Sequence, residues 1–224
     1  ISDIFFDLDH TLWDFDANSF LAFDTILKEN HQTINTLEFI EIYAPINQAC
    51  WKLYQTDKIT HDELRYQRLK QTFDALNYSI SDSEIDAISN KYIALLPENN
   101  ILFQDAKTVL KYLSGKYRLH IITNGFSTVQ EKKLRNSRLE NYFTTITNSE
   151  MAGAKKPNSI IFEYALSLAN ASKNRSIMIG DCIEADVLGA INFGMQAIWF
   201  NPNQENCPEN ILQINNLIEL KIIL

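Results

Sequence analysis

The sequence has 224 residues, of which 46% are hydrophobic, and it can bury one substantial core and a smaller second one. Its formal net charge is −8, and its basic runs are no longer than pairs such as Lys132–Lys133 and Lys155–Lys156. A groove for a nucleic-acid polymer needs clustered cations to meet phosphates, so this composition excludes that class of partner. An anionic substrate must therefore be bound by a few local groups.

The cysteines indicate a reducing compartment. Cys50, Cys182 and Cys207 are odd in number and widely spaced, which predicts neither a disulfide framework nor a zinc site. No apolar stretch approaches the roughly 20 residues that a membrane helix needs, and the first residues follow a strand pattern instead of that of a targeting segment. We therefore expect a cytoplasmic protein without a membrane partner, although the sequence does not begin with methionine and residues can precede Ile1.

The chain opens with a strand that ends in acids. Residues 4–6 are apolar and lead directly into Asp7, and Asp9 follows two positions later in the stretch IFFDLDHTLWD. Neighbouring carboxylates repel one another unless a positive group or a chemical task holds them together. The end of this strand is therefore a candidate site.

Residues 16–97 predict helices and little strand. Their apolar residues recur at spacings of three and four, and Thr60 with Glu63 has the spacing of a capping box. The expected N-caps are Asn18 or Ser19, Thr60 and Ser81. We interpret this segment as an all-helical cap domain inserted into another domain.

From residue 101 onward, helical and strand patterns alternate. Gly115 ends the first of these helices and Gly194 the last, as C-terminal glycines do. The expected strands are 117–124, 143–149, 176–181 and 195–201, and the expected helices 103–115, 127–137, 158–170 and 184–194. Such alternation predicts an α/β fold, a Rossmann-like doubly wound parallel sheet. The catalytic core would comprise residues 1–15 and 98–224.

Polar residues follow several of the predicted strands. Ligands of open parallel sheets bind beyond the carboxyl ends of the strands, so these residues are expected to converge on one rim. They are Asp7 and Asp9 after the first strand, Thr123 and Asn124 after the second, Asp181 and Asp186 after SIMIG, and Lys156 in the loop GAKKP.

This rim suits phosphate chemistry. The four acids together demand a hard cation, and ligands that are all oxygen suit Mg²⁺. Lys156 adds a positive charge, and the Thr123 hydroxyl can donate to phosphate oxygens. One carboxylate can attack phosphorus while a second protonates the leaving oxygen and later deprotonates water. The strand period does not decide where the Asp9 side chain points, and its backbone carbonyl is an alternative metal ligand.

Four motifs in this order, DLDHT, TNG, GAKKP and GDCIEAD, resemble those of the haloacid dehalogenase superfamily, in its phosphatase branch. The resemblance implies that Asp7 is the nucleophile and Asp9 the general acid and base. It also implies phosphate binding by Thr123, Asn124 and Lys156, with Lys155 as the other candidate for the lysine. The implied metal ligands are Asp7, Asp9, Asp181 and Asp186, of which Asp186 either binds directly or through water. The helical insertion resembles the smaller cap class of the superfamily.

The resemblance also bears on the substrate. Haloacid dehalogenases lack an acid two residues after the nucleophile, where this sequence has Asp9, so dehalogenation is disfavoured. The stretches DLDHTLWDFDANS and SEMAGAKKPNSIIFEYAL resemble bacterial pyrimidine 5'-nucleotidases. A nucleoside monophosphate is the expected substrate, with His10, Trp13 and Phe15 as candidate contacts to substrate or cap. The alternatives are a phosphatase of phosphoglycolate or a sugar phosphate, a phosphomutase, and a non-catalytic binding module. The sequence leaves the oligomeric state open.

Single residues also have purely structural interpretations. Asp7 and Asp9 taken alone fit a turn, and Asp181 fits the N-cap of the helix that follows it. Cys182 is expected to pack instead of acting as a nucleophile, because no histidine partner is evident nearby, and His120 is expected to face the core or the sheet. The order of the four motifs favours the catalytic interpretation.

Overall fold

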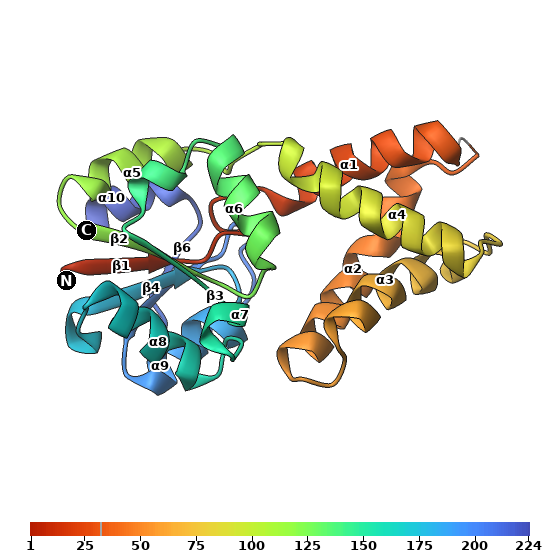
Figure 1. Ribbon diagram of the computed structural model, residues 1–224. Coiled ribbons are helices and arrows are strands. Elements are labelled where there is room, and N and C mark those ends of the chain that lie inside the picture. The colour runs from red at the N-terminus through yellow and green to blue at the C-terminus, as the bar shows by residue number, and fades with distance from the viewer. Residues whose placement is uncertain (32) are drawn as a thin grey trace. The chain divides into compact units, whose positions relative to one another are not determined.

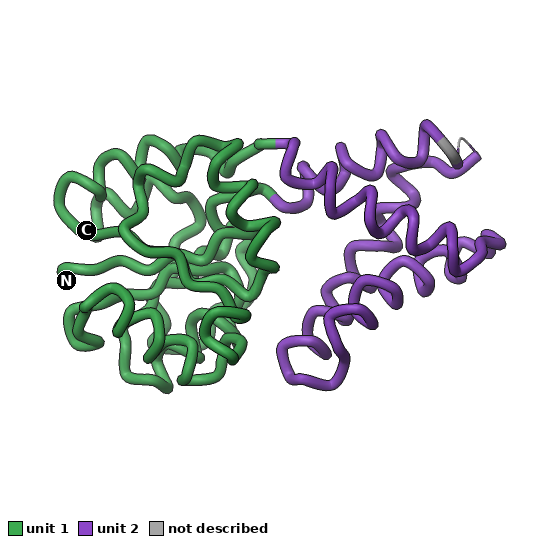
Figure 2. The backbone as a smooth tube through the Cα atoms, viewed as in Figure 1, with its two compact units in different colours: residues 1–14, 100–224 green, residues 15–99 purple. Residues whose placement is uncertain are grey.

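The computed structural model describes residues 1–31 and 33–224. The chain divides into two compact units, residues 1–14 with 100–224 and residues 15–99 (Figure 2). We call them the core unit and the helical unit. Across the residues described, no helix is long and apolar enough to cross a membrane.

The core unit contains a parallel six-stranded sheet in the order β3-β2-β1-β4-β5-β6 (Figure 1). The strands are β1 (Asp3–Phe6), β2 (Arg118–Thr123), β3 (Thr145–Asn148), β4 (Ser176–Gly180), β5 (Gln196–Phe200) and β6 (Gln213–Ile214). This is the strand order of the Rossmann fold, so the predicted fold class is confirmed. β1 is central, with β2 on one side and β4 on the other.

Helices cover both faces of this sheet, and Figure 1 shows α5 and α10 on one face and α8 and α9 on the other. The α-helices are α5 (Ala106–Ser114), α6 (Ser127–Asn136), α7 (Ser149–Ala152), α8 (Ser159–Ala169), α9 (Gly189–Phe193) and α10 (Leu220–Ile223). Shorter turns are η2 (Glu140–Tyr142), η3 (Lys173–Arg175), the π-helical η4 (Ile183–Leu188) and η5 (Leu217–Glu219). A strand covered on both faces is apolar throughout, and Ile4, Phe5 and Phe6 of β1 are accordingly all buried.

The helical unit has a core of its own. Its elements are α1 (Phe15–Asn30), α2 (Thr36–Gln55), α3 (His61–Ala75), α4 (Asp82–Leu95) and η1 (Leu96–Glu98). Phe23 of α1 packs on Tyr92 of α4 and on Phe39 of α2, with ring centroids 4.3 and 4.8 Å apart. Phe39 in turn packs on Phe73 of α3 at 5.4 Å. Aromatic contacts therefore join all of the unit's α-helices.

Two of the expected N-caps of this unit are confirmed and one is wrong. Thr60 begins α3 and Ser81 begins α4, each in a complete capping box. Asn18 and Ser19 do not begin a helix, because α1 already starts at Phe15 and both residues are buried inside it. The Ser19 hydroxyl instead forms a hydrogen bond with the Tyr92 hydroxyl at 2.9 Å. A buried serine bonded across a bundle resembles an N-cap in sequence alone.

The chain leaves and re-enters the core unit at neighbouring points. The Asp14 backbone N–H donates to the Ile101 carbonyl at 3.1 Å, and the Phe103 N–H donates to the Leu12 carbonyl at 3.0 Å. An isolated antiparallel bridge joins Trp13 to Leu102 between them. Backbone contacts therefore join the two segments of the core unit at the position where the helical segment is inserted.

Candidate active site

Asp7 and Lys156 form the centre of the candidate site. Asp7 follows β1, and its backbone N–H donates to the Ile179 carbonyl of β4 at 2.9 Å. The Lys156 ammonium lies 2.5 Å from Asp7 Oδ1, 2.6 Å from Asp186 Oδ1 and 2.8 Å from the carbonyl oxygen of Ile122. Lys156 is buried, so this ammonium has exchanged its water shell for carboxylate and carbonyl oxygens.

Three carboxylates gather at this lysine. Asp7, Asp181 and Asp186 each offer an oxygen, and these oxygens all lie within 4.8 Å of one another. Three carboxylates beside a single ammonium leave an excess of negative charge in a largely buried place, which a divalent cation would neutralise. The charge and the oxygen donors of this cluster fit Mg²⁺.

Burial and mutual repulsion show in the pKa values of the cluster. Burial raises the pKa of Asp7 well above its usual range, and the Asp186 and Asp181 carboxylates add to the rise while Lys156 opposes it. Burial, together with the Asp186 carboxylate, raises the pKa of Asp181 to about 8. Burial alone would lower the pKa of Lys156, but the carboxylates of Asp186 and Asp7 outweigh it and the pKa is raised. Lys156 is therefore charged throughout the physiological range.

Neighbouring groups hold Asp181 and Asp186 in place. The Thr11 hydroxyl donates to Asp181 Oδ1 at 3.1 Å and accepts from the Asp181 backbone N–H at 3.0 Å. The Cys182 N–H donates to Asp186 Oδ2 at 3.1 Å. Gly180 packs against Asp186 so closely that a Cβ there would lie 2.6 Å from the Asp186 Cβ. Thr11 is the last residue of the DLDHT motif, but the sequence interpretation assigned it no role.

Cys182 begins the π-helical turn that carries Asp186. Its sulfur accepts from the Ala185 N–H at 3.4 Å, so Cys182, and not Asp181, is the N-cap of this turn. Burial, and secondarily the Asp186 carboxylate, raises the pKa of the Cys182 thiol to about 12. A cysteine acts as a nucleophile in its thiolate form, and the raised pKa of Cys182 disfavours that form.

Thr123 ends β2, Asn124 follows it, and the two side chains have different environments. The Asn124 side chain accepts from the Lys156 N–H at 2.8 Å and donates to the Lys156 carbonyl at 3.0 Å. Both ends of the amide therefore fix the lysine loop. The Thr123 oxygen accepts from the Gly125 N–H at 3.0 Å and from Gln130 Nε2 at 2.8 Å. With both lone pairs used, the Thr123 hydroxyl hydrogen is left to donate, as a phosphate-binding hydroxyl must.

The Asp9 carboxylate is outside the three-carboxylate group. Lys133 Nζ lies 2.6 Å from Asp9 Oδ1, and Gln130 Nε2 donates to Asp9 Oδ2 at 2.8 Å. Both partners are on α6, and neither was singled out in the sequence, where their only signal is a spacing of three on one helix face. This geometry does not support metal binding by the Asp9 side chain, because both of its carboxylate oxygens already accept hydrogen bonds from α6.

The three candidate contact residues differ in exposure. His10 is partly exposed and has a left-handed backbone, with φ of 60°. Trp13 is fully buried in the core unit, and the Lys133 ammonium lies 4.2 Å from the centroid of its ring. Phe15 is the first residue of α1 and is buried. Of these residues, only His10 offers exposed surface next to the site.

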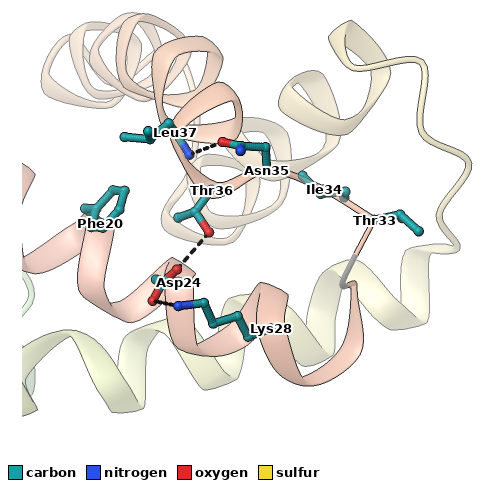
Figure 3. A pocket seen from close by; sticks show the side chains of 8 residues that line it. All are labelled: Phe20, Asp24, Lys28, Thr33, Ile34, Asn35, Thr36 and Leu37. Atoms are coloured by element: carbon teal, nitrogen blue, oxygen red, sulfur yellow. Dashed lines mark hydrogen bonds and ion pairs between the residues drawn. The ribbon is translucent and has the colours of Figure 1, made fainter.

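A hollow in the helical unit lies between the end of α1 and the start of α2 (Figure 3). Asp24 on its wall accepts from Lys28 at 2.7 Å and from the Thr36 hydroxyl at 3.0 Å. The remaining lining residues are Phe20, Thr33, Ile34, Asn35 and Leu37. The acid of this hollow is thus already neutralised and hydrogen-bonded, and we assign it no reactive role.

The core unit is thus an α/β domain with a carboxylate cluster and a buried lysine beyond the ends of its parallel strands. Residues 3–194 match the model of the haloacid dehalogenase-like hydrolases, and the chain belongs to that family. The predicted family membership is therefore confirmed, and the protein is a hydrolase.

The relatives of this chain include two named nucleotidases. It is 34% identical to the pyrimidine 5'-nucleotidase YjjG of Escherichia coli, with 99% of this chain and 96% of that protein covered. It is 32% identical to the pyrimidine 5'-nucleotidase PynA of Streptococcus pneumoniae, with 89% and 84% covered. The crystal structure of the HAD-hydrolase YfnB of Bacillus subtilis, bound to magnesium, aligns with a TM-score of 0.89, 31% identity, and 100% and 98% of the two chains covered. The sequence resemblance to pyrimidine nucleotidases is confirmed.

Proposed function

We propose that this hydrolase is a Mg²⁺-dependent phosphatase that acts on small phosphate monoesters, nucleoside 5'-monophosphates in particular, through a phosphorylated Asp7. The observation that carries the proposal is the group of Asp7, Asp181 and Asp186 around the buried Lys156. The two nucleotidase relatives support the choice of nucleotides, and the excess negative charge of the cluster supports the metal.

In the first chemical step, an Asp7 oxygen attacks phosphorus and the bond from phosphorus to the leaving oxygen breaks. Asp9, in its acid form, gives its proton to that oxygen, and the alcohol departs. Lys156 and Thr123 donate to phosphate oxygens or to Asp7 and hold the negative charge in place. This step produces an aspartyl-phosphate and an Asp9 carboxylate.

In the second step, Asp9 removes a proton from water, whose oxygen attacks phosphorus. The bond between phosphorus and Asp7 breaks, which releases inorganic phosphate and restores the Asp7 carboxylate. One ester and one water thus give one alcohol and one phosphate, and the proton on Asp9 is recovered.

Asp7, Asp181 and Asp186 would hold the metal, with the Asp9 backbone carbonyl as a further candidate ligand. When bound, Mg²⁺ would supply positive charge to the phosphate oxygens and to the cluster. Thr11 orients Asp181 for this task, and the Cys182 N–H orients Asp186.

We further propose that residues 16–97 act as a cap that selects the substrate, and that residues 1–15 and 98–224 carry out the reaction. Every residue with a chemical role in the mechanism lies in the core unit. The odd number and wide spacing of the cysteines support the expected reducing cytoplasm.

Phosphate release from a panel of nucleoside monophosphates, sugar phosphates and phosphoglycolate, with and without Mg²⁺, tests the proposal. We expect turnover that requires Mg²⁺, prefers pyrimidine monophosphates, and falls below detection in Asp7→Asn. Glu163→Gln is the matched control, because Glu163 is exposed on α8 of the core unit.

The other outcomes are equally informative. Turnover confined to sugar phosphates or phosphoglycolate would keep the chemistry and overturn the nucleotide assignment. If a parallel assay showed halide release from 2-haloacids without Mg²⁺, the assignment as a phosphatase would be wrong and the protein would be a dehalogenase. Undiminished activity in Asp7→Asn would overturn the mechanism.

A further inference from the structure

Helix α6 holds the Asp9 carboxylate by both of its oxygens. Lys133 Nζ lies 2.6 Å from Oδ1, and Gln130 Nε2 donates to Oδ2 at 2.8 Å. With one donor at each oxygen, the carboxylate can neither rotate about its own axis nor shift along the helix without losing a bond. The orientation of the expected acid and base is therefore set by α6.

Lys133 is an unusual residue for such a position. Its side chain is 2% exposed, and its ammonium lies over the ring of the buried Trp13 at 4.2 Å. Lysines are seldom fully buried. The buried ammonium loses its hydration, and its pairing with an Asp9 side chain that is 22% exposed contributes little net stability compared with an apolar residue at position 133. Folding alone therefore does not explain a lysine here, whereas a need to fix Asp9 does.

Gln130 connects Asp9 to the phosphate-binding hydroxyl. Its side-chain amide nitrogen carries two hydrogens, and it donates one to Asp9 Oδ2 and one to Thr123 Oγ1, each at 2.8 Å. A single amide group thereby fixes the positions of the proton donor and of a phosphate ligand relative to each other. Gly125 leaves the space that this amide occupies, since a Cβ there would lie 2.5 Å from Gln130 Cδ.

We propose that Gln130 and Lys133 are positioning residues that hold Asp9 in the geometry required for proton transfer to and from the substrate. The proposal rests on the proposed function, in which Asp9 is the general acid and base. Neither residue touches the reacting atoms. Both act through Asp9, and Gln130 acts through Thr123 as well.

Positioning of an acid has a recognisable kinetic effect. A general acid contributes about 10²- to 10⁴-fold when the leaving oxygen needs a proton. An alkoxide needs one, whereas p-nitrophenolate departs readily without one. Loss of positioning should therefore slow the phosphorylation of Asp7 by an alkyl phosphate and leave its phosphorylation by p-nitrophenyl phosphate almost unchanged.

The experiment measures single-turnover rates and steady-state kinetics with Mg²⁺ for wild type, Lys133→Met, Gln130→Met and Lys133→Arg. The substrates are p-nitrophenyl phosphate and the alkyl phosphate that the wild type hydrolyses best. Lys132→Met is the matched control, because Lys132 is the exposed neighbour on the same helix. Thermal unfolding of each variant shows whether it is folded.

We expect Lys133→Met and Gln130→Met to slow single turnover of the alkyl phosphate by about 10- to 100-fold, within the contribution of a general acid. In Lys133→Met, the burst rate with p-nitrophenyl phosphate and the concentration that half-saturates the burst should change by less than about threefold, because binding and acid-independent attack are retained. Lys133→Arg should recover part of the lost rate, since arginine restores a cation that can donate to Asp9.

Two results would overturn the inference while leaving the proposed function intact. One is a Lys133→Met enzyme that is folded and as fast as Lys132→Met on the alkyl phosphate. The other is an equal loss of the single-turnover rate and of the burst rate on the two substrates with no recovery in Lys133→Arg, which would mean general damage to the site. A wild-type protein that hydrolyses neither substrate would overturn the proposed function and the inference with it.

Discussion

The site residues owe their properties to burial as much as to identity. Burial raises the pKa of Asp181, and the Asp186 and Asp7 carboxylates raise that of Lys156 against the effect of burial. Groups with displaced pKa values are typical of active sites. Burial also displaces the pKa of a histidine in β2 that has no proposed catalytic role.

That histidine is His120 of β2, and it is fully buried. Its Nε2 lies 3.1 Å from Asp3 Oδ1 and its Nδ1 lies 2.8 Å from the Thr145 hydroxyl. Burial lowers the pKa of His120 below its usual 6.5, and the Asp3 carboxylate only partly opposes this. The predicted location of His120 in the sheet is thus observed.

The lowered pKa gives the first prediction. Below about pH 6.5 the unfolded chain takes up a proton at His120 that the folded chain resists, so this group favours folding above that pH and ceases to do so as the pH falls. We expect the contribution of His120 to the free energy of unfolding to decrease from pH 7 to pH 5 by at most about 1.4 kcal/mol per pH unit. The raised pKa values of Asp7 and Asp181 act in the opposite direction, but they do so in wild type and in His120→Gln alike. In urea unfolding, wild type should therefore lose stability relative to His120→Gln as the pH falls from 7 to 5.

His61 provides the control, because it lies on the helical unit and its side chain is 40% exposed. His61→Gln should keep the wild-type pH dependence. Equal slopes in wild type and His120→Gln would contradict the prediction.

At the scale of elements, the ends of neighbouring strands decide which side chains meet. β1 lies between β2 and β4, so Asp7 lies beside the ends of both. The π-helical turn η4 then returns Asp186 toward the end of β4, and Gly180 permits that approach. A side chain at position 180 would occupy the space of the Asp186 carboxylate.

The second prediction follows from this contact. In Gly180→Ala the new methyl group would lie 2.6 Å from the Asp186 Cβ, so either the strand end or the turn must move. We expect Mg²⁺-dependent phosphate release to fall by at least about tenfold, since small displacements of catalytic groups are costly. Steady-state assays over a range of Mg²⁺ concentrations should also show a weaker apparent affinity for the metal.

Gly115→Ala is the comparison for this variant. Gly115 ends α5 with φ of −76°, and its nearest neighbour to an added Cβ is a carbonyl oxygen at 3.5 Å. That substitution should leave activity and metal affinity unchanged. If both alanine variants behaved as wild type, the close approach of Gly180 to Asp186 would not be needed for activity or for metal binding.

At the scale of the whole molecule, the two units have separate cores and the metal-binding carboxylates belong to one of them. The hydrogen bonds between residues 12–14 and 101–103 close the core unit where the helical segment departs.

The third prediction is that the core unit folds without the helical segment. Replacement of residues 15–99 by a short Gly/Ser linker should give a protein that unfolds cooperatively and whose Tm rises on addition of Mg²⁺, because a ligand of the folded state alone stabilises it. Calorimetry with and without Mg²⁺ measures both properties. Loss of the cooperative transition would show that the helical unit is needed for folding, and loss of the Mg²⁺ effect alone would show that it completes the metal site.

The sequence by itself determined the fold class, the alternating strands and helices of residues 103–201 except α7, and Asp7, Thr123, Lys156, Asp181 and Asp186 as candidates. It could do so because hydrophobic periodicity and motif order are properties of short segments. Only the tertiary structure decided that the Asn124 amide fixes the lysine loop and that Trp13 is buried. It alone also showed that Gln130 and Lys133 hold Asp9, which lies more than 120 residues away in the chain. Such contacts depend on which face of a helix is packed against a strand end, and no local pattern encodes that choice.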